Sequence, residues 1–240
     1  MVGPFWDERS VSEFLGTDKW ICIPRFGITQ ERPEVDPETG QVRTKIKNRG
    51  VDSATEAWIN LAAEIKELLK LGSVDKNVAI VQKWRSRSQI LQGKKLDLAG
   101  WALDERRAYR QIGIKVGHRR WSVIIIIDYR SGRVTFWVMI GHSFGLTASV
   151  YNYNRRSRII NEILLKEFGI VASYFYDDKF GIELEATVRS ALQTAKDLHR
   201  WIGADFEESK TQISKKITIL GVLPHITTNS DLETCKLKRF

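Results

Sequence analysis

Two adjacent carboxylates, Asp177 and Asp178, are the residues of the sequence that most suggest chemistry. They stand in the segment Tyr174–Gly181, at a turn between two apolar arms. Aspartate is common in turns, so the pair has a purely structural interpretation. In the functional interpretation, the hairpin holds two negative charges close together, which is costly unless a divalent cation neutralises them. The pair by itself is compatible with either interpretation.

A third carboxylate on a neighbouring strand would complete a site for two Mg²⁺ ions, held about 4 Å apart over a phosphoryl group. Two residues are candidates for it. Asp104 follows a short apolar stretch and precedes Ile112 and Ile114, which alternate as strand residues do. Asp97 stands between two leucines a few residues earlier. The residues themselves leave the choice between Asp104 and Asp97 open.

The elements that must position these acids alternate between helices and strands, without the regular βαβ order of a parallel sheet. This order favours an α+β fold, with an antiparallel sheet backed by helices. Hydrophobic spacing and capping residues predict helices over residues 10–16, 53–72, 75–91, 147–168 and 188–202. Runs of β-branched and aromatic residues predict strands over 121–127, 134–140, 170–176, 180–184 and 216–222, and turn residues predict a hairpin over 34–43.

The composition excludes several classes of protein. The 240 residues are 42% hydrophobic and 28% charged, which is typical of a globular chain. No apolar run approaches the ~20 residues that cross a bilayer, so no membrane partner is expected. The acidic N-terminus predicts no signal peptide. With only two cysteines and four scattered histidines, neither a disulfide framework nor a structural zinc site is expected, and an intracellular location, cytoplasm or nucleus, is indicated.

The positive charge is concentrated in one part of the chain. The net charge is +9, and residues 83–120 carry eleven basic and three acidic side chains, which is nearly the whole excess. Such a concentration favours a polyanionic partner.

Five segments in a fixed order resemble the fingers–palm region of reverse transcriptases encoded by mobile elements. Asp104-x-x-x-Ala108-Tyr109-Arg110-Gln111 resembles the first catalytic motif of that family. The other four resemble its Pro-Phe-Gly-Leu segment, its aromatic-x-Asp-Asp hairpin, its helix–Gly–Lys motif and its primer-grip strand: residues 143–149, 175–178, 201–211 and 219–222. The resemblance covers roughly residues 93–222. It selects Asp104 over Asp97, because only Asp104 has the Ala-Tyr dipeptide at the family's offset.

The resemblance implies the RNA-directed DNA polymerase core of a retroelement. Such an enzyme adds dNTPs to a primer 3′-OH on an RNA or DNA template, using two Mg²⁺ ions, with Mn²⁺ as the alternative metal. The implied fold is α+β, with an antiparallel palm sheet backed by helices and a smaller fingers subdomain. Two other classes remain: a non-catalytic nucleic-acid-binding relic of this fold, and a structural protein without nucleic acid. The three aspartates argue against the relic, and the localised charge argues against the structural protein.

The resemblance also implies roles for individual residues. Metal ligation falls to Asp104, Asp177 and Asp178, while Lys210 would protonate the leaving pyrophosphate. The nucleotide would contact Tyr109, which discriminates against a ribose 2′-OH, together with Phe144, Gly145 and the basic hairpin residue Arg43. Nucleic acid would contact Arg155, Arg156, Arg158, Leu220 and Gly221, although a solvated helix face explains the three arginines equally well.

The sequence departs from the family's pattern at two motif positions. Ser143 replaces the usual proline before Phe144, and Lys179 follows the Asp-Asp pair where an apolar residue is usual. A cation at residue 179 would either weaken metal binding or reach a phosphate.

The resemblance gives an expected division of the chain. A fingers-like region should span residues 1–93 and a palm residues 94–224, with a fingers hairpin at 115–140 inserted between the first and second motifs. Residues 225–240 would form a C-terminal tail, with the thumb absent or truncated. The length leaves no room for ribonuclease H or integrase domains, and the sequence leaves open whether a longer precursor carries them.

Overall fold

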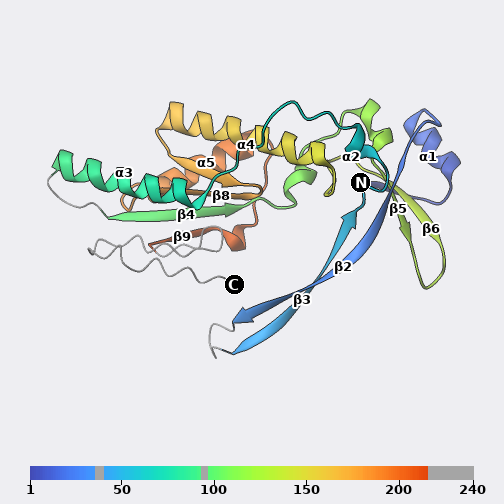
Figure 1. Ribbon diagram of the computed structural model, residues 1–240, viewed down its shortest axis with the longest axis horizontal. Helices are drawn as coiled ribbons and strands as arrows, with labels where there is room; N and C mark the ends of the chain where they lie inside the picture. The colour runs from blue at the N-terminus through green and yellow to red at the C-terminus, as the bar shows by residue number, and fades with distance from the viewer. Residues whose placement is uncertain (36–40, 93–96, 216–240) are drawn as a thin grey trace. The chain divides into compact units, whose positions relative to one another are not determined.

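The structure is a computed structural model that describes residues 1–35, 41–92 and 97–215 (Figure 1). The chain divides into two compact units. Unit 1 comprises Met1–Lys66 and Ile112–Val150, and unit 2 comprises Glu67–Gln111 and Tyr151–Phe240. The predicted boundary at residue 93 differs from this division, because helix α3 (Val74–Gln92) packs on the sheet of unit 2. The segment 115–140 does group with the N-terminal region, in unit 1.

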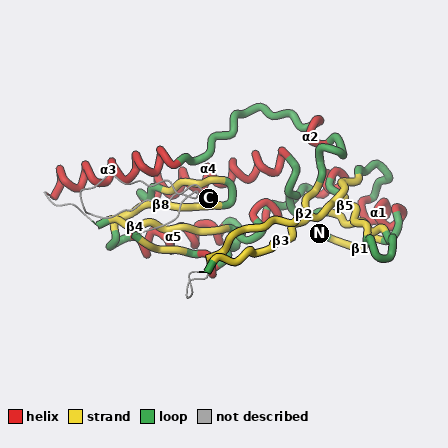
Figure 2. Tube along the Cα trace, turned by 60° about the horizontal axis from the view of Figure 1, so that its bottom comes forward, coloured by secondary structure: helices red, strands yellow, loops and turns green. Residues whose placement is uncertain are grey.

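Unit 2 is built on a four-stranded antiparallel sheet with the strand order β7–β8–β4–β9. The strands are β4 (Leu98–Asp104), β7 (Ala172–Phe175), β8 (Asp178–Leu184) and β9 (Gln212–Ser214). Helices α4 (Thr147–Phe168) and α5 (Val188–Trp201) cover one face of the sheet, and α3 packs on the other. Figure 2 shows α3 and α5 on either side of β4 and β8.

The core of unit 2 depends on a close contact between neighbouring strands. Trp101 on β4 is wholly buried among residues of α4 and α5. Its partner in register on β8 is Gly181. A Cβ at residue 181 would lie 2.5 Å from the indole, so the position requires glycine. This contact joins the two central strands. The candidate acids lie at the C-terminal end of β4 and the N-terminal end of β8.

Unit 1 contains a five-stranded sheet with the strand order β1–β6–β5–β2–β3. The strands are β1 (Val2–Phe5), β2 (Cys22–Val35), β3 (Val42–Asp52), β5 (Val123–Ile127) and β6 (Val134–Val138). The first three residues of β2 pair in parallel with β5, and the other pairs are antiparallel. Helices α1 (Glu8–Leu15) and α2 (Ile59–Ala62) complete the unit.

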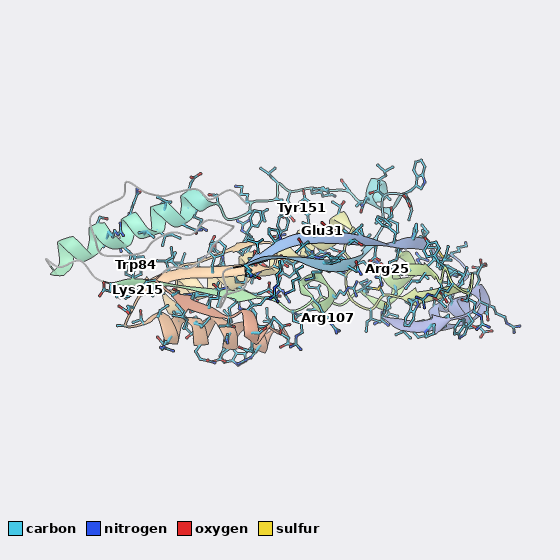
Figure 3. The ribbon with its side chains drawn as sticks, turned by 90° about the horizontal axis from the view of Figure 1, so that it is seen from below. Arg25, Glu31, Trp84, Arg107, Tyr151 and Lys215 are labelled. Carbon is cyan, nitrogen blue, oxygen red and sulfur yellow. The ribbon has the colours of Figure 1, made fainter. Side chains whose placement is uncertain are left out.

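The strands β2 and β3 continue beyond the sheet as a long two-stranded ribbon. Its pairing runs from Arg25 opposite Asp52 to Val35 opposite Val42. At its base the Arg25 guanidinium binds the buried Asp52 carboxylate, with an Nε–Oδ1 distance of 2.6 Å. Figure 3 shows Glu31 farther along the ribbon than Arg25. The hairpin predicted over residues 34–43 is present as paired strands, while its turn lies outside the described residues.

Most of the predicted elements are confirmed. The helices over 10–16, 75–91, 147–168 and 188–202 correspond to α1, α3, α4 and α5, and the strands over 121–127, 134–140, 170–176 and 180–184 correspond to β5, β6, β7 and β8. The strand predicted over 216–222 lies outside the described residues. Strands β1, β4 and β9 were not predicted from the sequence.

The helix predicted over residues 53–72 is wrong, because only the four-residue helix α2 forms there. Trp58 adopts a left-handed backbone conformation with φ of 62°. Trp58 and Leu61 are exposed, so the apolar stripe of the predicted helix has nothing to cover. The Asn60 side chain instead donates to the Gly145 carbonyl at 2.8 Å and accepts from the Thr147 amide at 2.9 Å.

The chain has the predicted α+β class, with the antiparallel sheet of unit 2 packed between helices. Within the described ranges, no helix combines the length and the apolar character needed to cross a membrane.

Candidate active site

Three carboxylates lie at one end of the sheet in unit 2. Asp104, the last residue of β4, stands directly opposite Asp178, the first residue of β8. Directly opposed residues of an antiparallel pair have their Cβ atoms about 5 Å apart. Asp177 belongs to the two-residue loop that joins β7 to β8. The fold therefore brings Asp104 beside the Asp177–Asp178 pair from 73 residues away in the sequence.

The electrostatics of these groups reflect their closeness. Although Asp178 reaches solvent, partial burial raises the pKa of its carboxyl group, and the charges of Asp177 and Asp104 raise it further. Burial raises the pKa of the Tyr109 phenol to about 12, with further contributions from Asp177 and Tyr176. Tyr109 is buried. The predicted sugar-discriminating residue thus belongs to the same unit as the acidic pair and responds to the charge of Asp177.

Lys210 joins the acids from a third segment of the chain. Its Nζ lies 3.0 Å from each carboxylate oxygen of Asp104. The segment before Lys210 is fixed by backbone contacts, since the Glu207 amide donates to the Asp104 carbonyl at 3.0 Å and Phe206 forms a β-bridge with Glu105. An exposed ion pair of this kind contributes only about 0–1 kcal/mol to stability. The ion pair matters for function because it places the Lys210 ammonium group beside Asp104.

Gln111 is a positioning residue to which the sequence analysis gave no role. Its side-chain Nε2 donates to the Asp205 carbonyl at 2.9 Å, and its Oε1 accepts from the Asp205 amide at 2.6 Å. These bonds tie the loop that carries Tyr109 to the segment that leads to Lys210. The loop needs such support because Arg107, which Figure 3 labels, has a positive φ of 56°. The only sequence signal was its place at the end of the first motif.

The donor set suits Mg²⁺ by its chemistry. Within the described ranges, no three His, Cys, Asp or Glu side chains stand in a ready metal-ligand arrangement, and the Asp104 carboxylate binds Lys210. Carboxylate oxygens are nevertheless the ligands that Mg²⁺ prefers. The raised pKa of Asp178 also reflects a repulsion among Asp104, Asp177 and Asp178 that a divalent cation would relieve. These three residues therefore fit the metal in donor type and charge.

Lys179 does not extend toward the acids, contrary to both roles expected for it. The residue is almost wholly buried, at 1% exposed. Burial lowers the pKa of its ammonium group to about 8, while the Glu105 carboxylate raises it. The Glu105 carboxylate thus favours the charged form of Lys179, on the face of the sheet that α4 and α5 cover.

The three arginines of α4 have different surroundings. Arg156 turns inward, where its guanidinium pairs with the buried Glu105 carboxylate, so it is not part of an exposed basic face. Arg155 is exposed and pairs with Glu67. Arg158 is exposed, and with Arg155 and Tyr151 it lines a cavity of about 220 Å³ in unit 2. Of the three, Arg155 and Arg158 have the exposure that contact with a nucleic acid requires.

The remaining predicted site residues lie in unit 1 or outside the described ranges. Arg43 is the first of four exposed basic residues that alternate along β3 and so share one face of the ribbon: Arg43, Lys45, Lys47 and Arg49. Phe144 and Gly145 precede α4, and Gly145 has a φ of 96°. Leu220 and Gly221 lie outside the described residues.

The basic cluster of residues 83–120 is divided between the two units. Its members on α3 and around Arg107 belong to unit 2, whereas Lys115, Arg119 and Arg120 belong to unit 1. Arg106 faces the acidic side chains of Asp205 and Glu207, with distances of 3.5 and 3.6 Å. The positive charge along β3 is the more continuous basic feature.

Glu183 on β8 allows the effect of burial on a carboxyl group of the sheet to be tested. It is 5% exposed, and burial raises its pKa to about 7 from a usual 4.5. As the pH rises from 4.5 to 7, the unfolded chain loses this proton first, so wild-type stability falls. Glu183→Gln removes the cost, so the variant should gain about 3 kcal/mol relative to wild type between pH 4.5 and 7.5.

Urea unfolding at both pH values measures this difference in the free energy of unfolding. Glu185→Gln, which alters a more exposed carboxyl group just beyond β8, is the matched control. A Glu183→Gln difference that is equal at the two pH values would contradict the prediction.

Comparison with known proteins adds no relative from which a role could be transferred. No family model matches the chain, and no curated protein is significantly similar to it. At the end of the antiparallel sheet, Asp104 stands opposite Asp178 and binds Lys210, and the pKa of the buried Tyr109 responds to the charge of Asp177.

Proposed function

We propose that this chain is the core of an RNA-directed DNA polymerase of a retroelement, with unit 2 as its palm and the first unit in the place of the fingers. The single observation that carries the proposal is that Asp104 stands opposite Asp178, the neighbour of Asp177 in the chain, and that its carboxylate binds Lys210. These four residues come from three segments, each of which resembles a different reverse-transcriptase motif. A chance resemblance of separate segments gives no reason for their functional positions to converge.

The proposed chemistry assigns each side chain a task. Two Mg²⁺ ions, when bound, lower the pKa of the primer 3′-OH and stabilise the leaving pyrophosphate. Asp104, Asp177 and Asp178 would hold the ions. Lys210, whose ammonium group already lies at the site, donates a proton to the leaving group. Tyr109 presents its ring to the sugar of the nucleotide and excludes a 2′-OH.

The polyanionic partners in this proposal are a template–primer duplex of RNA or DNA and dNTPs. The exposed basic row of β3, which begins at Arg43, and the exposed Arg155 and Arg158 offer cations for phosphates. An intracellular site of action, and further domains supplied by a polyprotein, belong to the same proposal.

Primer extension tests the proposal. Purified wild type, with an RNA template, a DNA primer, dNTPs and Mg²⁺, should extend the primer, and Asp177→Asn should not. Asn keeps the size of the side chain, so the loss reports the carboxylate. Equal incorporation by the two proteins would contradict the mechanism. Tight template binding by both proteins without incorporation by wild type would instead indicate the non-catalytic relic.

A further inference from the structure

Lys179 lies directly behind the acidic pair. Successive residues of a strand point to opposite faces of its sheet, so Lys179 and Asp178 face opposite ways. Leu103, the partner of Lys179 in register, belongs to the core beneath α4 and α5. Lys179 therefore carries a positive charge into the apolar layer between the sheet and these helices. A buried ammonium group is costly unless it is paired and hydrogen-bonded.

The ammonium group of Lys179 meets partners from three elements. It donates to Ser157 Oγ at 2.8 Å and Tyr153 Oη at 3.1 Å, both on α4. It also donates to the Tyr176 carbonyl at 2.9 Å, and it lies 3.5 Å from Glu105 Oε1. One atom thus joins α4, the β7–β8 loop and the residue after β4.

The contact with Tyr176 acts on the loop that carries Asp177. Tyr176 has a φ of 51°, which is unusual for a bulky residue and persists only where the surroundings hold it. The carbonyl that Lys179 binds belongs to the peptide group between Tyr176 and Asp177. Binding that oxygen fixes the plane of this peptide group, and with it the direction in which Asp177 leaves the backbone.

The contact with Glu105 acts on the other strand. Glu105 follows Asp104, and its side chain is wholly buried. Its carboxylate pairs with Arg156 on α4, and its Oε1 lies 4.0 Å from His199 Nε2 on α5. Burial lowers the pKa of His199 to about 4, so this imidazole is neutral at pH 7 and Lys179 and Arg156 are the cations that face Glu105.

We infer that Lys179 is a positioning residue, whose ammonium group sets Asp104 and the Asp177–Asp178 pair relative to each other from behind the sheet. It acts through the Tyr176 peptide group and through Glu105, and it contacts neither nucleotide nor metal. The inference rests on the proposed function for the task of the three carboxylates. The fixed geometry of the loop stands apart from that function.

Three variants separate positioning from simple stabilisation. Lys179→Met removes the ammonium group and keeps the length of the side chain. Lys215→Met is the matched control, because it removes a lysine from an exposed ion pair with Glu185 in the same unit (Figure 3). The double variant Lys179→Met/Glu105→Gln removes both charges of the Lys179–Glu105 pair, so that the partly exposed Arg156 is the charge that remains in this cluster.

The first measurements are urea unfolding and hydrogen exchange of the peptide that spans residues 174–180. Lys179→Met should lower the urea midpoint by about 1–3 M and speed exchange in this peptide roughly tenfold. The double variant should regain most of the midpoint but not the protection of the loop. Lys215→Met should resemble wild type in both measurements.

The third measurement is primer extension under saturating Mg²⁺. Both variants at residue 179 should lose roughly 10²-fold in kcat, because misplaced reacting groups act on the chemical step, while KM for the dNTP should stay near its wild-type value. A double variant that regains wild-type exchange and kcat would overturn the inference, as would a Lys179→Met protein that matches Lys215→Met. A wild-type protein without polymerase activity would contradict the proposed function. The hydrogen-exchange measurement would still test the role of Lys179, because it needs no nucleotide.

Discussion

Asp104→Asn is expected to reduce primer extension about 10³-fold while leaving the chain folded, because loss of a metal-holding carboxylate removes several kcal/mol of transition-state stabilisation. Asp104 is partly exposed, and its carboxylate forms an ion pair with Lys210 at the surface. Its replacement should therefore change the free energy of unfolding by less than ~1 kcal/mol. Single-turnover extension measures the first effect, and urea unfolding measures the second.

Asp97→Asn is the matched control for this prediction. Asp97 precedes β4 and Asp104 ends it, so the two acids stand about 20 Å apart at opposite ends of one strand. Asp97 Oδ2 lies 4.0 Å from Lys215 Nζ in an exposed ion pair, far from the Asp177–Asp178 pair. Asp97→Asn should thus keep wild-type extension. Equal losses in the two variants would show that Asp104 has no special place in the reaction.

Gly145→Ala is expected to destabilise unit 1 by about 3–5 kcal/mol, through a clash and a strained backbone acting together. A Cβ at residue 145 would lie 2.0 Å from the carbonyl oxygen of Asp52, and the φ of 96° is one that L side chains rarely adopt. Asp52 cannot retreat easily, since its carboxylate holds Arg25 at the base of the β2–β3 ribbon. Urea unfolding, followed by hydrogen exchange of peptides from unit 1, measures the effect.

Gly132→Ala separates the two contributions at Gly145. Gly132, in the turn between β5 and β6, also has a positive φ, of 66°, but an added Cβ there would meet nothing within 4 Å. Gly132→Ala should lower the free energy of unfolding by only about 1–2 kcal/mol. Similar losses for the two variants would mean that the approach of Asp52 is unimportant. The result also bears on function, because Gly145 is the glycine expected to admit the nucleotide.

The candidate site could be predicted from the sequence as far as its motifs were local. Asp177 and Asp178 lie in a short hairpin. The apolar residues of its two arms predict strands, and β7 and β8 form as expected. Asp104 needed the resemblance, because β4 was not recognised as a strand. Its run Leu-Ala-Gly-Trp-Ala-Leu contains small residues that fit a strand only where Trp101 packs over Gly181.

The role of Lys179 could not be predicted, because strand alternation decides it and the partners are remote. A lysine beside two aspartates suggests an exposed charge, and only the register with Leu103 turns it toward the core. Its partners Tyr153 and Ser157 lie more than 20 residues earlier, on a helix. Local pattern also failed over residues 53–72, where helical spacing exists but no surface is present to bury it.

The placement of Asp178 and Lys179 on opposite faces has a consequence for how the sheet finds its pairing during folding. A slip of β8 by one residue against β4 would exchange the faces of all its side chains. It would then press the Asp178 carboxylate toward buried Glu105 and leave the partners of Lys179 without their cation. Two buried like charges cost far more than a misplaced apolar side chain. The free-energy cost of these buried charges therefore disfavours the slipped register of β4 and β8. It acts at the ends of the strands that carry Asp104 and Asp178.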